Sequence, residues 1–275
     1  MTLDAQIAAL PSRALVRVEG PDARAFLHGL LTQDVATLAV DELRYGALLN
    51  PQGRLLHDLF LLGEVDGVLV DVSAAQREAL VTRLRQYRLR AKVEIEPVEG
   101  AVYAAWSGAD TGAPDPRLSA LGARSYRDPP SAATASEDEY DAHRLALGVP
   151  DPARDAAGER TYPLEANLDL LNGVDFRKGC FVGQETTSRM KRRAAVKSRM
   201  VPIVFDGSPP PFGAEVLTSD LRAGEVLTGR DGRALALLRL DRAAAAPLTV
   251  EGRPVRLDPP DWLAEAVRQA AGAEA

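Results

Sequence analysis

The order of apolar runs between residues 14 and 98 restricts the possible folds of this chain more than any other feature. Strand-like runs, of which 14–19 and 91–98 alternate apolar and polar side chains, are interrupted twice by helix-start signals, Pro21 after Gly20 and Ser73 as an N-cap. The expected strands are residues 14–19, 45–49, 54–62, 68–72 and 91–98. The run 68–72 continues the sheet, and the remaining order of strand, helix, strand, strand, helix, strand is that of a ferredoxin-like split βαβ unit, so we predict the α+β class.

The pattern changes after residue 193. Short apolar runs broken by Gly, Pro and Asp predict a small β-barrel or sandwich, followed by a closing helix over 262–270. We therefore expect an α+β region over 1–195 and a C-terminal β-barrel over 196–275. Within the α+β region we expect a first unit of about 12–100 plus 160–195, and a second unit of about 101–159.

Composition excludes several classes of protein. The 275 residues are 46% hydrophobic and 26% charged, as in ordinary globular proteins, and no apolar run approaches a membrane-spanning length. Residues 1–11 lack the features of a signal peptide, and aromatic residues, at 5%, are too few for a nucleic-acid stacking platform. One cysteine excludes an internal disulfide framework and fits a reducing compartment. We expect a cytoplasmic protein with no membrane, DNA or metal ligand, since His28, His57 and His143 show no ligand spacing.

The segment 173–193, GVDFRKGCFVGQETTSRMKRR, carries the single cysteine, Cys180, and starts a strongly basic stretch. Between 177 and 199 only Glu185 opposes eight basic residues, although the whole chain has a net charge of −6. They are Arg177, Lys178, Arg189, Lys191, Arg192, Arg193, Lys197 and Arg199. This local positive charge predicts an anionic ligand or partner and favours a reactive thiolate at Cys180. The alternatives are a buried structural cysteine and a solvated helix face.

The same segment resembles the YgfZ family of folate-binding proteins, whose pattern is K-G-C-[FY]-x-G-Q-E-x-x-x-R. Every fixed position is present, from Lys178 to Arg189. Further similar blocks lie at 26–35, 48–54, 87–93 and 162–168. The resemblance implies the fold of the aminomethyltransferase (T-protein) of the glycine cleavage system. It also implies tetrahydrofolate, or a one-carbon derivative, as cofactor and a role in making or repairing iron–sulfur enzymes.

Asp58 interrupts an apolar strand directly after the turn 50–53. It resembles the aminomethyltransferase aspartate that lies beside the pterin, where a carboxylate can accept two N–H groups and assist proton transfer near N5. The alternative is a solvent-facing side chain on an alternating strand. The expected catalytic residues are Cys180 and Asp58. The expected folate-binding residues are Asn50, Asp58, Asn167, Lys178, Gln184 and Arg189. Gln184 and Asn167 could instead satisfy backbone groups.

Cluster ligation limits what Cys180 can do, because iron–sulfur clusters normally need four protein ligands. One cysteine cannot supply them, so any cluster must involve a partner. We favour a tetrahydrofolate-binding protein that assists cluster assembly or repair, with Cys180 at the mouth of a central cavity and cluster assembly proteins or cluster enzymes as partners. The alternatives are a folate-dependent aminomethyl- or methyltransferase and an accessory protein with weak RNA contacts through the basic residues.

Overall fold

The computed structural model describes residues 5–108, 111–127, 132–156, 160–192, 196–244 and 246–272. The chain forms two compact units, each assembled from two stretches of sequence. The first contains Met1–Asp141 and Leu171–Gln184; the second contains Ala142–Leu170 and Glu185–Ala275. The segment that carries Cys180 therefore belongs to the first unit, although the sequence before and after it belongs to the second.

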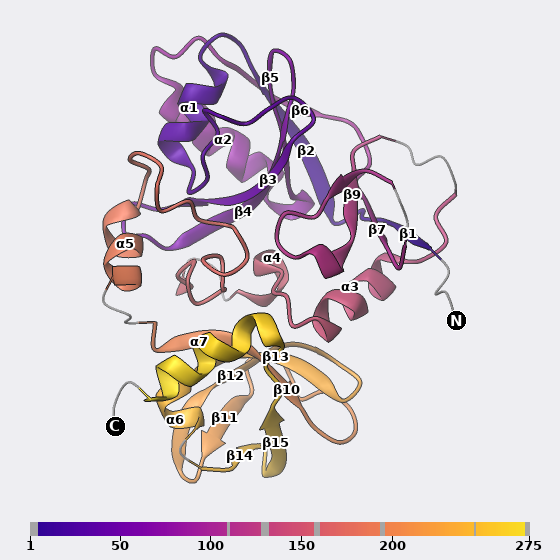
Figure 1. The fold of residues 1–275 in the computed structure, drawn as a ribbon, viewed down its shortest axis with the longest axis vertical. Coiled ribbons are helices and arrows are strands. Elements are labelled where there is room, and N and C mark those ends of the chain that lie inside the picture. The colour runs from indigo at the N-terminus through magenta and orange to yellow at the C-terminus, as the bar shows by residue number, and fades with distance from the viewer. Residues whose placement is uncertain are drawn as a thin grey trace. The chain divides into compact units, whose positions relative to one another are not determined.

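The first unit is built on a five-stranded antiparallel sheet with the order β3-β4-β5-β2-β6. Figure 1 shows α1 and α2 together on one face of this sheet. The strands are β2 (Arg13–Glu19), β3 (Leu43–Leu49), β4 (Leu55–Gly63), β5 (Gly67–Ser73) and β6 (Glu94–Val98). The helices are α1 (Ala23–Leu30) and α2 (Arg77–Arg88), the latter preceded by a 3-10 turn at Ala74–Gln76.

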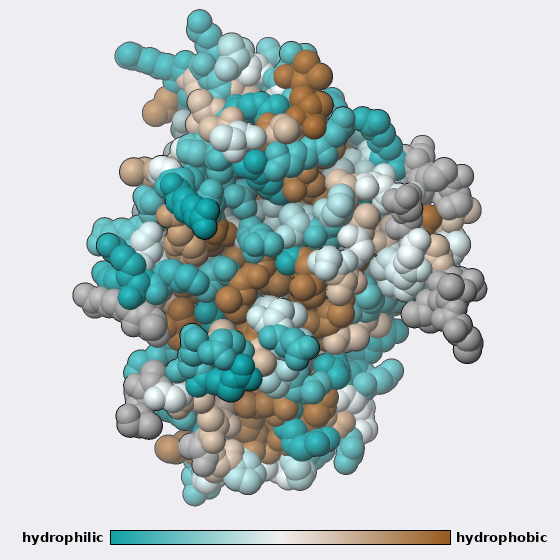
Figure 2. Space-filling view, in the orientation of Figure 1, coloured by the Kyte–Doolittle hydropathy of each residue, from teal (hydrophilic) through white to brown (hydrophobic). Residues whose placement is uncertain are grey.

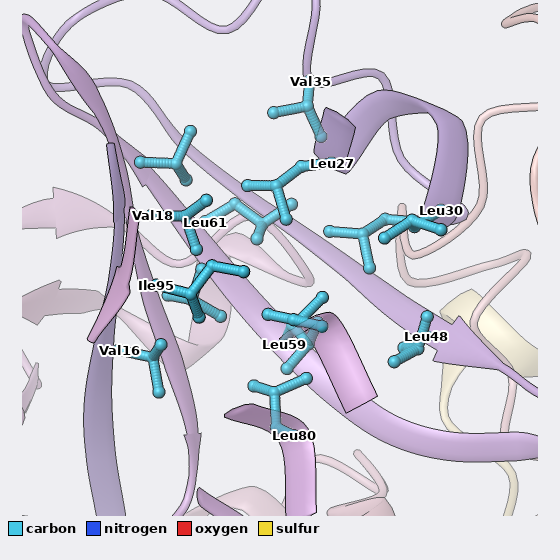
Figure 3. Close-up of a cluster of buried hydrophobic side chains, with 14 of the residues drawn as sticks. Val16, Val18, Leu27, Leu30, Val35, Leu48, Leu59, Leu61, Leu80 and Ile95 are labelled. Atoms are coloured by element: carbon cyan, nitrogen blue, oxygen red, sulfur yellow. The ribbon is translucent and has the colours of Figure 1, made fainter. Parts of the chain in front are cut away.

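Alternation along the strands divides the buried side chains between the two faces of this sheet. Val16 and Val18 of β2 pack with Leu27 of α1 and Leu80 of α2, and Figure 3 shows these side chains converging in one apolar core. Leu15, on the same strand, belongs to a separate cluster on the opposite face. This period of two is the signal from which the strand was predicted.

A second, four-stranded sheet contributes to the cluster on that opposite face. Its order is β1-β7-β9-β8. The strands are β1 (Gln6–Ala9), β7 (Tyr103–Trp106), β8 (Ala113–Pro114) and β9 (Ala123–Ser125), with a 3-10 turn at Ser119–Leu121. Ala8, Ala104 and Trp106 pack with Leu15 and Leu69 of the larger sheet. Helix α3 (Glu137–Ala146) follows and spans the boundary between the units.

The second unit is built on a closed six-stranded barrel with the order β10-β13-β12-β11-β14-β15, in which β15 pairs with β10. The strands are β10 (Ser198–Val204), β11 (Glu215–Thr218), β12 (Leu221–Arg230), β13 (Arg233–Arg239), β14 (Leu248–Val250) and β15 (Arg253–Leu257). The helices are α4 (Pro152–Asp155), α5 (Gln184–Arg192), α6 (Leu240–Ala243) and α7 (Asp261–Gly272). Leu263 and Val267 of α7 pack into the barrel core, and Figure 1 shows α7 lying across the barrel.

The predicted fold class is confirmed, including the C-terminal barrel and its closing helix. Some local features differ from the predictions. Strands β1 and β14 were not predicted, because runs of four and three residues carry little periodicity. Ser73 does not cap α2: it precedes the 3-10 turn, makes no side-chain cap, and α2 begins at Arg77.

Figure 2 shows hydrophilic and apolar side chains interspersed over this face of the molecule, and the exposed side chains of α2 are mostly charged or polar. Among the described helices, none combines the length and the apolar character needed to cross a bilayer.

Candidate functional site

The segment that leads to Cys180 is fixed to residues that follow α1. The Thr32 hydroxyl donates to the Gly173 carbonyl at 2.6 Å. The Gln33 side-chain amide donates to the Asn172 carbonyl at 2.7 Å. Each bond joins positions more than a hundred residues apart in sequence, and the Thr32 bond is buried. The approach to Cys180 is therefore held by the first unit.

Lys178 fixes the loop two residues before Cys180. Its Nζ donates to the carbonyl of Leu31 at 2.6 Å and to that of His28. The last carbonyls of a helix have no partner within the helix and carry partial negative charge, so a buried ammonium group stabilises them. Lys178 thus closes the C-terminal end of α1.

Gly183 fixes the loop three residues after Cys180, against the turn between β3 and β4. Its φ is +81°, and a Cβ there would lie 2.7 Å from the Asn50 carbonyl oxygen and 2.9 Å from Gly53 Cα. Only glycine fits this position without moving backbone atoms. Asn50 itself closes the turn, because its Oδ1 accepts the Arg54 amide at 2.9 Å.

Cys180 is exposed between these two anchors. The next residue, Phe181, is buried at 7% exposure and lies 5.2 Å from Lys178 Nζ, measured to the ring centroid. Phe176 remains 37% exposed and Arg177 is exposed. The alternative interpretation of Cys180 as a buried small hydrophobe is therefore wrong. The loop buries Phe181 and presents its thiol to solvent.

Burial lowers the pKa of Lys178 from 10.5 to about 8. The negative charges of Asp34, Asp175 and Cys180 act in the opposite direction and raise that pKa. The cation nearest in sequence to the thiol is thus partly desolvated and interacts electrostatically with it.

His28 and Asp34 also belong to this site, and the sequence did not single them out. His28 Nδ1 lies 2.9 Å from Asp34 Oδ1, and His28 Nε2 would lie 3.8 Å from a Cβ placed on Gly179. The Asp34 carboxylate accepts the Thr37 hydroxyl at 2.5 Å and the Ala36 amide at 2.9 Å. Both residues lie in the block 26–35, and the similarity of this block to the family is the sequence signal that could have located them.

Asp58 lies on β4, is only 3% exposed, and faces Arg13 of β2. The distance from Arg13 Nη1 to Asp58 Oδ2 is 3.6 Å, and Arg13 Nε binds Asp71 Oδ1 at 2.6 Å. The alternative of a solvent-facing carboxylate is wrong. The structure pairs this aspartate with an arginine of the protein itself.

The Arg13–Asp58 pair is one edge of a larger buried network in the first unit. Arg124 Nη1 binds Asp71 Oδ2 at 2.9 Å, and its guanidinium lies 3.7 Å from the centroid of Phe60. The charged members are Arg13, Arg117, Arg124, Asp58, Asp71 and Asp115. Three cations and three anions balance, so the network can remain charged while buried. Only Asp58 of this group was recognised in the sequence.

The fold implies tetrahydrofolate, and the residues assigned to it fit poorly. A pterin held by Asp58 would need that carboxylate as its acceptor, where Arg13 already lies. Lys178 and Asn50 bind backbone groups. Gln184 Nε2 makes a long contact of 3.5 Å to the Gly179 carbonyl. The folate contacts of these residues stay predictions.

The remaining predicted residues lie in the second unit. Asn167 is fully buried; its Nδ2 donates to the Met200 carbonyl at 2.8 Å, and its Oδ1 accepts Arg199 Nη1 at 3.1 Å. Its side-chain amide therefore binds a backbone carbonyl, which is one of the two roles that the sequence allowed for Asn167. Arg189 is exposed on α5.

Asp169, rather than Glu185, is the anion that pairs with two of the basic residues. Arg199 Nη1 lies 2.9 Å and Lys191 Nζ 3.2 Å from its carboxylate oxygens. Arg193 lies outside the described residues. Within the described part of the chain, no group of three or more His, Cys, Asp or Glu side chains is placed to hold a metal ion.

Two family models match separate parts of this chain. The GCVT N-terminal domain matches residues 7–105, and the CAF17 C-terminal beta-barrel domain matches residues 197–265. These ranges correspond to the larger sheet with its helices and to the closed barrel. The aminomethyltransferase-like fold predicted from the sequence is thus supported in both parts.

Several curated relatives are described as iron-sulfur cluster assembly factor IBA57, or its homolog, mitochondrial. The human protein is 34% identical over 92% of this chain and 84% of its own length. The Pyricularia oryzae homolog is 32% identical over 90% of this chain and 74% of its own length. In the Neurospora crassa homolog, 32% identical, the chain spans only 57% of the relative's length.

A solved structure agrees with the fold over most of the chain. The glycine cleavage system aminomethyltransferase T from Bartonella henselae superposes with a TM-score of 0.74, covering 94% of this chain and 85% of that one. Its sequence identity is 17%, so the likeness concerns the fold alone.

The relatives contradict the predicted compartment and leave the YgfZ assignment unconfirmed. The expectation of a cytoplasmic protein is wrong, because the relatives are named as mitochondrial proteins. A single cysteine indicates only the absence of a disulfide framework and does not distinguish one reducing compartment from another. The YgfZ assignment stays a prediction, since the relatives carry another name. With more than 30% identity over most of their length to several of them, the chain belongs to the IBA57 family.

Proposed function

We propose that this chain is an iron–sulfur cluster assembly factor in which Cys180 donates a thiolate to cluster iron held by a partner protein. The observation that carries the proposal is the exposure of Cys180 on a loop that is fixed at both ends, by Lys178 and by Gly183. The relatives' description as cluster assembly factors supports the same assignment.

The number of protein ligands that a cluster needs requires a partner protein. A cluster normally takes four protein ligands, and this chain has one cysteine. The other ligands therefore come from cluster assembly proteins or from a cluster enzyme. When the Cys180 sulfur binds iron, the thiol proton passes to solvent and a weaker ligand leaves the iron. The ammonium of Lys178 stabilises the anionic sulfur in this step.

The fixed conformation of the loop lowers the entropy cost of binding a cluster. A thiol on a flexible loop would lose conformational entropy when it bound a cluster, whereas the anchors at Lys178 and Gly183 remove much of that cost before binding. Phe176 and Arg177, both exposed in the same loop, are of the residue types enriched in protein interfaces. We propose that they contact the partner that carries the cluster.

The transferase alternative depends on Asp58 as an available carboxylate, and its pairing with Arg13 argues against that role. Tetrahydrofolate remains the ligand that the fold implies, and no chemical step is proposed on it. The RNA alternative is weakened because Lys178, Lys191 and Arg199 bind carbonyl or carboxylate groups of the chain.

The test replaces Cys180 by alanine in cells that lack their own family member, and measures both the activity of a [4Fe–4S] enzyme and the level of this protein. We expect Cys180→Ala to lose the rescue at an unchanged protein level. Thr82→Ala, an equally small change at an exposed position of α2, should rescue fully. Full rescue by Cys180→Ala would refute the proposal.

A direct measurement uses the purified chain and a glutathione-coordinated [2Fe–2S] complex as the cluster source. Visible circular dichroism should change on mixing with the unaltered chain and remain constant with Cys180→Ala. The same change in both proteins would show that the cluster binds elsewhere.

A further inference from the structure

The end of α2 and the turn after it form a short segment, residues 83–92, in which every charged side chain is positive. Its sequence is RLRQYRLRAK. The basic residues are Arg83, Arg85, Arg88, Arg90 and Lys92, and all of them except the half-buried Arg83 are exposed. Because the whole chain has a net charge of −6, this concentration of cations is local, and the cations repel one another.

None of these five side chains forms an ion pair within the described part of the chain. Arg85 Nη2 donates to the Ile95 carbonyl at 2.8 Å, which is a neutral acceptor. Cations in the last turn of a helix are stabilised by the helix dipole, and this accounts for Arg85 and Arg88. It does not account for Arg90 and Lys92, which follow the helix.

The acidic residues of β6, which follow the segment in sequence, point to the other face of the sheet. Ile95 packs in the core beneath α1 and α2, so Glu94 and Glu96, on either side of it, point away from the helices. On the helix side, Asp22 Oδ2 accepts the Lys92 amide at 2.7 Å. Alternation along β6 therefore leaves most of the positive charge of the segment without acidic neighbours on its own face.

Two of the five cations have part of their charge offset in another way. Arg88 and Lys92 border an open hollow, which is also lined by Arg24 and by three carboxylates. The carboxylates are those of Glu19, Asp66 and Glu94. Arg83, Arg85 and Arg90 do not line this hollow, so the excess of positive charge lies mainly on these three residues.

Leu89 lies between Arg88 and Arg90 and is 86% exposed, the largest exposed fraction of any large apolar side chain among the described residues. Its φ is +46°, a conformation that glycine adopts at many helix ends and that strains a leucine. The other apolar residues of the segment are buried or pack against the core of the first unit. Neither packing nor the geometry of the turn therefore explains a leucine at this position.

We propose that the turn after α2 binds the surface of an anionic bilayer, with Leu89 inserted among the lipid headgroups and the flanking arginines on lipid phosphates. Each basic residue close to an anionic bilayer strengthens binding by about fivefold. An apolar side chain that projects between cations fits a bilayer interface, which needs no preformed pocket to accept it. Single-stranded nucleic acid would use the cations and stacked aromatic rings, and would leave Leu89 without a role.

This inference departs from the expectation of no membrane partner. That expectation rested on the absence of an apolar run long enough to span a bilayer. A contact at the surface needs only cations and an apolar side chain at the interface. The proposal uses no residue of the Cys180 loop and is independent of the proposed function.

The test is cosedimentation of the full chain with vesicles of phosphatidylcholine, either alone or with one third phosphatidylglycerol. We expect binding to the anionic vesicles that weakens as salt is added, and binding at least about tenfold weaker to phosphatidylcholine alone. No binding to anionic vesicles at millimolar lipid, or equal binding to both kinds, would overturn the proposal. A short single-stranded RNA that binds more tightly and displaces the vesicles would assign the segment to nucleic acid and would also overturn it.

Arginine variants locate the contact. Arg90→Gln should weaken binding to anionic vesicles by about fivefold, and the combination with Arg88→Gln by about 25-fold. Arg256→Gln, at an exposed position of β15, removes the same charge elsewhere and should leave binding unchanged. Equal losses from Arg90→Gln and Arg256→Gln would mean that the vesicles respond to total charge and not to this turn.

Leucine variants separate binding from folding. Leu89→Ala should weaken binding by about fivefold or more, whereas Leu221→Ala, at a position 62% exposed on β12, should not change it. Leu89→Gly should also weaken binding without lowering the midpoint of urea unfolding, because glycine adopts a positive φ without strain. Binding that is unaffected by both changes at Leu89 would refute the proposed insertion.

Discussion

Gly183 lies directly against Asn50, so that a Cβ on the glycine would stand 2.7 Å from the asparagine carbonyl oxygen. This contact joins the segment that carries Cys180 to the turn between β3 and β4, more than a hundred residues earlier in the chain. The position of Cys180 therefore depends on the backbone packing of the first unit.

Gly183→Ala should destabilise the protein by about 2–4 kcal/mol, since it adds a backbone clash to the strain of a left-handed φ. Gly213→Ala is the matched control: its φ is +82°, against +81° at Gly183, and a Cβ there meets nothing within 4 Å. The control should cost only about 1 kcal/mol. Urea unfolding of both variants measures the difference, and equal losses would mean that the turn yields to the extra methyl group.

The sequence predicted the larger sheet and the barrel because both repeat a simple pattern. Residues 14–19 alternate, and the strand they form places Leu15 and Val16 on opposite faces as expected. Strand β1 could not be found in this way, since it is held by pairing with β7 almost a hundred residues later. Local periodicity carries no information about such a partner.

The site was predicted only in part, because a sequence pattern shows neighbours along the chain and not contacts between distant residues. The residues around Cys180 are contiguous, so their pattern located the loop, whereas the atoms that fix it belong to Thr32, His28 and Asn50. Asp58 was noticed as a charge within an apolar strand. Its partner Arg13 lies on another strand, and only the fold brings the two together.

Cys180 should react with N-ethylmaleimide in the native protein, at a rate within about tenfold of that in urea, because its side chain is exposed. Intact-mass spectrometry gives the rate, and the single cysteine makes the assignment unambiguous. Protection of Cys180 until the protein unfolds would contradict its placement on the surface.

Asp58→Ala should destabilise the protein by about 2–3 kcal/mol, less than the full loss of a buried pair, because Arg13 keeps Asp71 at 2.6 Å. Glu265→Ala removes an exposed pair with Arg268 on α7 and should change stability by less than about 0.5 kcal/mol. Chemical denaturation compares the two. If Asp58→Ala is as stable as the control yet loses cellular function, the carboxylate serves a ligand and the pterin role regains support.

Lys178 should make stability depend on pH in alkaline solution. Its pKa is about 8 in the folded protein and near 10.5 in the unfolded chain. Between these values the unfolded chain binds the additional proton, so the contribution of Lys178 to stability rises with pH from about 8 to 10.5. Below pH 8 both states hold the proton, and the cost of burying the ammonium is fully present.

The measurement is the difference in unfolding free energy between the unaltered chain and Lys178→Met at several pH values from 7 to 10.5. Lys92→Met, at an exposed position, corrects for the loss of one positive charge. After this correction the unfolding free energy of the unaltered chain, relative to that of Lys178→Met, should increase steadily above pH 8. The reason is that the neutral amine costs less to bury than the ammonium. A difference that is constant across this range would mean that Lys178 stays charged through its bonds to the carbonyls of His28 and Leu31.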